Sequence, residues 1–122
     1  MRLESQVREN VCVMRLKGRF VTGSEDELRL AQRQLRDTKV DRAIIDLSEV
    51  PYIDSTGLAF VVELHKSLES RGGQLALANA NPRVRQVLAL TRIGEVIPVY
   101  EDESAARHAL SGSQLVAGGA GR

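Results

Sequence analysis

Apolar and polar residues alternate along the first part of the chain in the manner of two strands joined by a tight turn. Leu3 and Val7 stand between charged or polar neighbours, as in a half-exposed edge strand. Asn10 is a turn residue, and the run VCVMRL (11–16) after it is more apolar and is closed by Gly18. The pattern therefore predicts an antiparallel hairpin at the start of the fold.

Four later segments repeat their apolar residues at helical spacing, and three of them carry a start or stop signal. Ser24 and Glu27 have the form of a capping box at the start of the first helix. Gly72-Gly73 ends the second helix where a left-handed residue is needed, and Asn81-Pro82 begins the third. We expect helices over residues 25–37, from 55 to the stop at 71–73, over 82–90 and over about 102–110.

Short apolar runs between the helices predict the remaining strands. AIIDL (43–47) and QLALA (74–78) suit central strands, whereas the proline in IPVY (97–100) suits an edge. This alternation predicts an α/β fold, with a mixed sheet, an N-terminal antiparallel hairpin, a parallel centre and about four helices. Right-handed crossovers would bring the loops at 18–23 and 52–57 to the same edge of the sheet, where α/β proteins usually carry their function.

Composition and charge narrow the class of protein. The 122 residues suffice for one domain, which we place at 1–110, and the Gly, Ala and Ser of 111–122 predict a flexible tail. Seventeen Lys and Arg against 16 Asp and Glu leave no basic surplus for nucleic acid. Cys12 is the single cysteine and should be a buried thiol. With no signal peptide and no apolar run of ~20 residues, we expect a cytoplasmic protein with no membrane partner.

The segment DLSEVPYIDSTGL (46–58) carries the most information about function. It predicts a buried strand, a short polar crossing and a serine at the start of a helix. The unpaired backbone N–H groups and the positive dipole end of a helix can hold a phosphate there. Asp54 or Ser55 can cap the helix, and Gly57 would let another molecule approach closely. Capping alone would account for these residue types, so the wider context decides their meaning.

This context closely resembles the STAS domain, the sulphate transporter and anti-sigma factor antagonist family. The resemblance rests on IIDLS (44–48) and IDSTGL (53–58) and extends over about residues 3–110. The stand-alone domain is similar to bacterial anti-sigma factor antagonists. In that family the serine directly after the motif aspartate is phosphorylated by the anti-sigma factor, which is a serine kinase. The matching residue is Ser55, with Thr56 beside it as a weaker acceptor.

The resemblance implies a mechanism of partner switching without a cofactor. The unphosphorylated protein would bind the kinase and release its sigma factor, phosphate on Ser55 would abolish this binding, and a PP2C-type phosphatase would restore it. The protein itself would be a monomer or a weak dimer. The residues implied in partner binding flank the serine or lie in the neighbouring loop: Asp54, Thr56, Gly57, Leu58, Thr22, Gly23 and Ser24.

One position departs from the family pattern. Better-known antagonists have an acidic residue three positions after the glycine that closes the second strand, and here Val21 follows Gly18 at that distance. Acidic residues appear just beyond, at 25–27. Either the kinase-facing surface is more apolar, or the acidic function has moved along the helix.

Other function classes rank below this one. The chain could be a regulatory STAS subunit of a larger assembly, such as a stress-sensing complex or a lipid-transport ATPase, or a nucleotide-binding module. Catalysis is not expected, because DSTG (54–57) has one residue more than the Asp-(Ser/Thr)-Gly of aspartic proteases and there is no second carboxylate motif. His65 and His108 lack companions at metal-ligand spacing, so no metal site is expected.

Overall fold

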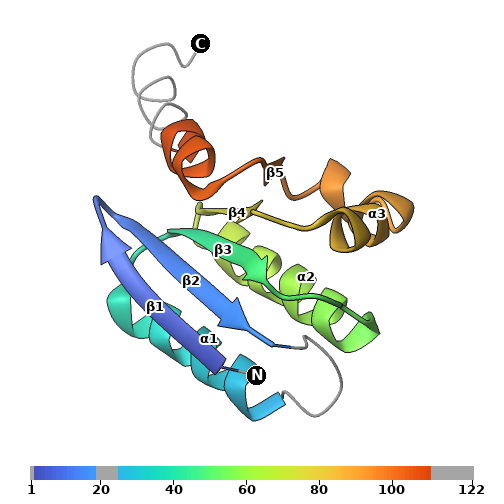
Figure 1. The fold of residues 1–122 in the computed structure, drawn as a ribbon. Helices are drawn as coiled ribbons and strands as arrows, with labels where there is room; N and C mark the ends of the chain where they lie inside the picture. Colours follow the sequence, from blue (N-terminus) through green and yellow to red (C-terminus); the bar gives the residue numbers. More distant parts are fainter. Residues whose placement is uncertain (1, 19–24, 111–122) are drawn as a thin grey trace.

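A mixed five-stranded sheet with the strand order β1-β2-β3-β4-β5 forms the middle of the molecule (Figure 1). The computed structural model describes residues 2–18 and 25–110. β1 pairs antiparallel with β2, and every later pair is parallel, which confirms the predicted fold class. The strands are β1 (Arg2–Arg8), β2 (Val11–Lys17), β3 (Arg42–Glu49), β4 (Gln74–Ala78) and β5 (Val99–Tyr100).

The opening hairpin turns at Glu9 and Asn10. Both residues have positive φ, 51° and 67°, as in a type I′ turn, whose twist matches that of the flanking strands. Arg8 and Val11 face each other directly across this two-residue turn. The predicted hairpin is therefore confirmed, and Asn10 serves in it as a residue that tolerates the left-handed region.

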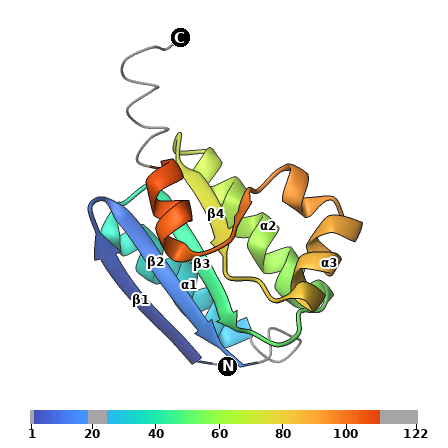
Figure 2. The same cartoon turned by 45° about the horizontal axis from the view of Figure 1, so that its top comes forward.

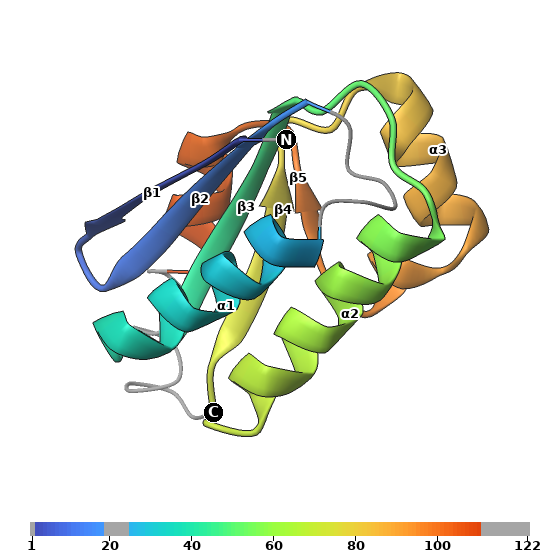
Figure 3. The same cartoon turned by 90° about the horizontal axis from the view of Figure 1, so that it is seen from below.

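The helices cover the two faces of the sheet unequally. α1 (Glu25–Thr38) and α2 (Ser55–Glu69) lie against one face, and α3 (Pro82–Leu90) lies at the end of the sheet beside β4 and β5 (Figure 3). Residues 103–110, also helical, cross the opposite face (Figure 2). These bounds agree closely with the predicted helices, although β5 is shorter than the predicted strand. The predicted capping residue Ser24 lies outside the described residues.

One element was not predicted, a 3-10 turn η1 (Ile93–Glu95) between α3 and β5. It follows Arg92, which has a left-handed φ of 63°. Non-glycine residues are uncommon in this region, and arginine is not a residue type that indicates a left-handed conformation.

Two apolar clusters hold the layers together. The larger one packs the sheet against the helices on the α1/α2 side and contains Cys12, Leu47, Val50 and Ile53. The smaller cluster joins Ala106 and Leu110 to the opposite face. Cys12 is buried as predicted, and burial raises the pKa of its thiol, which keeps the thiol protonated.

Candidate functional site

Ser55 is the first residue of α2, and it lies at the edge of the sheet where the parallel strands end. β3 ends at Glu49, and residues 50–54, here called the crossing, lead from it to the helix. Val50 and Ile53 are buried, which fixes the crossing to the core, whereas Tyr52 and Ser55 are exposed. The crossing is therefore anchored by two buried apolar side chains, and the serine lies on the surface.

Asp54 is the residue that caps α2. Its backbone is extended, and its Oδ1 accepts hydrogen bonds from the backbone N–H groups of Thr56 at 2.9 Å and Gly57 at 3.2 Å. The backbone carbonyl of Asp54 accepts the next bond, from the N–H of Leu58 at 2.9 Å. The alternative that the sequence left open, capping by Asp54 or by Ser55, is thus decided in favour of Asp54.

The Ser55 hydroxyl has a different environment. It is exposed, and it forms no hydrogen bond to any other residue in the part of the chain that the structure describes. The first turn of α2 contains no acidic side chain, so the nearest carboxylate in the sequence is the capping Asp54. An accessible hydroxyl beside the positive end of a helix is a chemically suitable acceptor for a phosphoryl group.

The other predicted residues of the motif differ in how much surface they offer. Thr56 and Leu58 are half-buried, and Leu58 packs against the larger apolar cluster. Gly57 is buried, so it offers little of its own surface to another molecule. Apart from the capping Asp54, the residues next to Ser55 in the sequence are uncharged.

The second predicted loop is only partly described. The N–H of Gly18 donates to the carbonyl oxygen of Glu49 at 2.9 Å, which places the ends of β2 and β3 side by side as predicted. Thr22, Gly23 and Ser24, as well as Val21, lie outside the described residues.

Asp46 forms a buried polar centre under this edge of the sheet that the sequence analysis missed. Its Oδ1 accepts from the N–H of Ser48 at 2.8 Å, and its Oδ2 accepts from Asn79 Nδ2 at 3.2 Å and from Arg15 Nε at 3.4 Å. Burial alone would raise the pKa of Asp46, but the bonds from Ser48 and Asn79 and the charge of Arg15 outweigh it and lower this pKa below its ordinary value. A charged residue within a predicted central strand was the available signal, because a buried charge needs partners.

Arg15, the register partner of Asp46, extends this network to the helical residues 103–110. Its Nη2 pairs with Glu103 Oε2 at 3.1 Å, and Arg107 Nη2 pairs with Glu103 Oε1 at 2.6 Å. The network therefore connects β2 and β3 to the helical residues 103–110, and it ties this small layer to the sheet.

Asn81 has two functions at once. Its Oδ1 accepts from the N–H of Val84 at 2.8 Å, which confirms the predicted cap of α3. Its Nδ2 also donates to the carbonyl oxygens of Val50 at 3.3 Å and Pro51 at 3.4 Å, in the crossing. The second function was not predicted.

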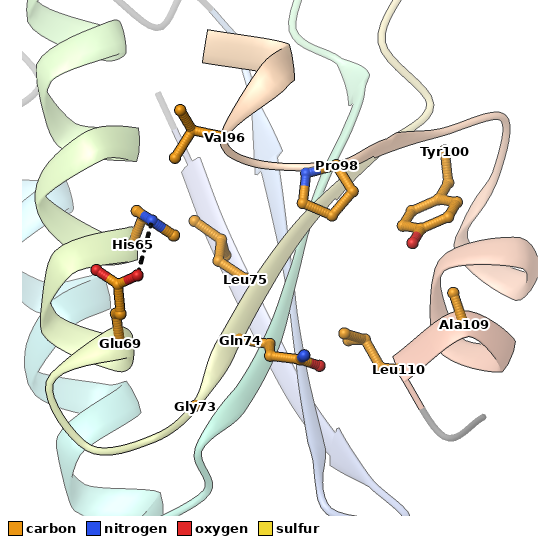
Figure 4. A pocket seen from close by; sticks show the side chains of 10 residues that line it. All are labelled: His65, Glu69, Gly73, Gln74, Leu75, Val96, Pro98, Tyr100, Ala109 and Leu110. Atoms are coloured by element: carbon orange, nitrogen blue, oxygen red, sulfur yellow. Dashed lines mark ion pairs between the residues drawn. The ribbon is translucent and has the colours of Figure 1, made fainter. Parts of the chain in front are cut away.

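A groove lies elsewhere, between α2, β4 and residues 103–110 (Figure 4). It has a volume of about 320 Å³, and His65 and Glu69 form an ion-pair contact of 3.9 Å on one of its walls, which is charged only when His65 is protonated. Ser55 does not line it. No three potential metal ligands gather anywhere in residues 2–18 and 25–110.

The comparison with known families matches this architecture. The profile of the STAS domain aligns with residues 2–106. The chain belongs to the STAS domain family. Within the described ranges, this STAS domain has no helix long and apolar enough to span a membrane.

Relatives of the STAS domain described here include regulators and a transporter protein. The anti-sigma F factor antagonist of Paenibacillus polymyxa is 22% identical over 104 residues, which are 84% of this chain and 89% of the relative. The Bacillus cell fate determinant SpoIIAA, an anti-sigma factor antagonist, superimposes with 20% identity in both of its forms. Its unphosphorylated form gives a TM-score of 0.68 and covers 91% of this chain and 99% of its own.

The phosphorylated form of SpoIIAA gives a TM-score of 0.67, with 88% and 99% of the two chains covered. A sulfate transporter family protein of Wolinella succinogenes is 25% identical, with a TM-score of 0.73 and coverage of 91% of this chain and 90% of its own. The fold is therefore common to regulators and transporter proteins, and the site has to distinguish between them.

Proposed function

We propose that this STAS domain is an anti-sigma factor antagonist that works by partner switching, with Ser55 as the phosphorylated residue. The observation that carries the proposal is the separation of two tasks at the start of α2. Asp54 caps the helix, and the neighbouring Ser55 exposes a hydroxyl that the cap does not use. Capping therefore does not explain why a serine stands at this position.

Phosphate on Ser55 would change the surface more than the fold. It adds about −1.5 to −2 charges, and the N-terminus of a helix tolerates such charge. It would stand next to the Asp54 carboxylate, among the uncharged side chains of Tyr52, Thr56 and Leu58. A partner surface packed against the neutral form would then face desolvation and like-charge repulsion. The similarity to both forms of SpoIIAA supports a fold that accommodates the phosphate.

The partners follow from this mechanism. The unphosphorylated protein binds a serine-kinase anti-sigma factor, which then releases its sigma factor, and a PP2C-type phosphatase resets the cycle. The contact surface comprises the region of Ser55 and the loop containing Thr22, Gly23 and Ser24. In this role the protein is regulatory rather than catalytic, and it acts in the cytoplasm.

The transporter relative favours a second candidate function. A domain of this fold in a sulfate transporter family protein is compatible with a regulatory subunit of a larger assembly. Such a subunit would bind its assembly whether or not Ser55 carries a phosphate, so the two candidates differ in one measurable property.

Phosphorylation and binding should be measured together. The wild-type protein is incubated with ATP and each serine-kinase anti-sigma candidate of its own cell, and intact-mass and peptide mass spectrometry locate the phosphate. Ser55→Ala, Ser55→Asp and the neighbouring control Thr56→Ala are treated in parallel, with capture of the kinase on each immobilised variant.

One phosphate on Ser55, binding retained in Ser55→Ala and lost in Ser55→Asp, is the expected result. Absence of phosphate with every kinase and equal binding by all variants would refute the switch and favour the assembly subunit. Binding of ATP or GTP by the isolated domain would instead favour a nucleotide-binding module.

A further inference from the structure

The crossing that leads to Ser55 is held by a residue about thirty positions later in the chain. Asn81 Nδ2 lies 3.3 Å from the carbonyl oxygen of Val50 and 3.4 Å from that of Pro51. Both distances lie just beyond the usual N–H···O range, but the two contacts act on two successive carbonyls of a short connection. Val50 and Pro51 have no part in a strand or helix that would otherwise fix their carbonyl oxygens.

The orientation of the Asn81 amide is set by its other contact. Its Oδ1 must face the N–H of Val84, because that N–H is a donor at the start of α3. The –NH₂ group is therefore turned toward the crossing, where both neighbouring atoms are acceptors. One side chain thus joins the start of α3 to the crossing before α2.

A second amide of the same connection supports this arrangement. Asn79, with a left-handed φ of 62°, donates from Nδ2 to Asp46 Oδ2 at 3.2 Å. The chain between β4 and α3 therefore contacts β3 near its end through Asn79 and the crossing through Asn81. One contact is thus made before the end of β3, at Asp46, and the other after it, in the crossing.

We infer that Asn81 is a positioning residue for Ser55. By holding the carbonyls of Val50 and Pro51, it keeps the crossing in the conformation in which Asp54 caps α2 and Ser55 faces outward. The effect of Asn81 on the conformation of the crossing does not depend on the proposed function, whereas its effect on the phosphorylation of Ser55 rests on that function.

Substitutions at position 81 can separate the two contacts of the asparagine. Asn81→Ser retains a good capping oxygen but is too short to reach the crossing, and Asn81→Asp retains the cap while it places a carboxylate against two carbonyl oxygens. Asn81→Ala loses both contacts and serves as the reference for a lost cap.

Amide hydrogen exchange, measured by NMR on the isolated protein, reports on each contact. In Asn81→Ser the amides of Thr56, Gly57 and Leu58 should exchange about tenfold faster, because the crossing is no longer held by the asparagine amide. In Asn81→Asp they should exchange faster still, because the carboxylate repels the two carbonyl oxygens. The amides of Val84 and Arg85 in α3 should change by less than about twofold in both variants, since the cap persists. In Asn81→Ala both groups of amides should exchange faster.

Kinetics with the kinase test the consequence for Ser55. When only part of the population has the competent crossing, the apparent KM for the protein substrate rises by the inverse of that fraction while kcat is unchanged. KM in Asn81→Ser should rise by the inverse of the competent fraction that the exchange rates give, which is about twofold where the crossing is open half of the time.

Unchanged amide exchange at residues 56–58 in both Asn81→Ser and Asn81→Asp would overturn the inference, independently of the kinase kinetics. A KM that differs from the value required by the measured open fraction would also overturn it and leave Asn81 with a structural role only. If no kinase phosphorylates the wild type, the proposed function fails, and the exchange rates still decide whether Asn81 holds the crossing.

Discussion

The carboxylate of Asp54 accepts a hydrogen bond of 2.9 Å from the backbone N–H of Thr56, across the position that Ser55 occupies. The cap and the exposed hydroxyl are thus adjacent in sequence and separate in function. This arrangement gives residue 54 the task of capping the helix and leaves the hydroxyl of residue 55 outside the cap.

Substitutions at these two positions should therefore differ in their effect on folding. Asp54→Ala should lower the free energy of unfolding by about 1 kcal/mol, because two N–H groups of α2 lose their acceptor. Asp54→Asn should retain most of the stability, and Ser55→Ala should stay within about 0.5 kcal/mol of the wild type. Urea titration followed by circular dichroism measures all three. Equal losses in Asp54→Ala and Ser55→Ala would contradict the assignment of the cap.

The buried Asp46 should make the stability of the domain depend on pH in the acid range. Its pKa is lower in the folded protein than its ordinary value of about 3.9, so the unfolded chain binds the proton more tightly. The stabilisation is therefore fully present above about pH 4 and is lost as the pH falls through the lower, folded-state pKa.

Asp46→Asn tests this contribution. It places an amide donor against the donors of Arg15 and Asn79, and at pH 7 it should cost about 1–3 kcal/mol. The difference between the variant and the wild type should shrink as the pH is lowered from 5 to 2, measured by urea unfolding at each pH. A difference that is constant over this range would show that the charge of Asp46 has no part in it.

The two glycines after α2 should respond differently to the same substitution. Gly72 has a φ of 77° and nothing within 4 Å of an added Cβ, so Gly72→Ala should cost about 1 kcal/mol of backbone strain. At Gly73 an added Cβ would lie 1.9 Å from the carbonyl oxygen of Asp41, which also accepts the N–H of Gln74. Gly73→Ala should therefore cost more than about 3 kcal/mol. Thermal unfolding of both variants provides the comparison, and a larger loss at Gly72 would be the opposite of what the structure requires.

The thiol of Cys12 should be unreactive in the folded protein. It is 1% exposed and its pKa is raised, so neither access nor ionisation favours attack on a thiol reagent. The rate of reaction with an aromatic disulfide at pH 8 should rise with urea concentration in parallel with unfolding. Rapid reaction without denaturant would place this thiol on the surface.

Much of the fold could be predicted from local patterns. The hairpin at Asn10 and the cap at Asn81 depend on residues close in sequence, and these residues were sufficient to predict both. The turn at Ile93–Glu95 was missed because it follows a left-handed Arg92, a residue type that gives no sign of such a conformation. Membership of the STAS family, inferred from the motif around Ser55, is confirmed.

The polar contacts under the site could not be predicted in the same way. Asp46 meets Asn79, and Asn81 meets Val50, only because two parallel strands end side by side in the folded chain. Such pairs are set by tertiary placement. A charged residue in a buried strand signals that Asp46 needs partners, a signal that the sequence analysis did not use, but it does not say which ones. The choice between Asp54 and Ser55 as the cap likewise required the backbone conformation, since both residue types are good caps.

The division of tasks between Asp54 and Ser55 also has an evolutionary consequence. A mutation that replaces the serine with alanine would remove the phosphorylatable hydroxyl and leave a domain that still folds. Under the proposed function, descendants of one ancestral sequence could thus lose or regain control by phosphorylation at a single codon, while selection for a folded domain acts on the neighbouring aspartate.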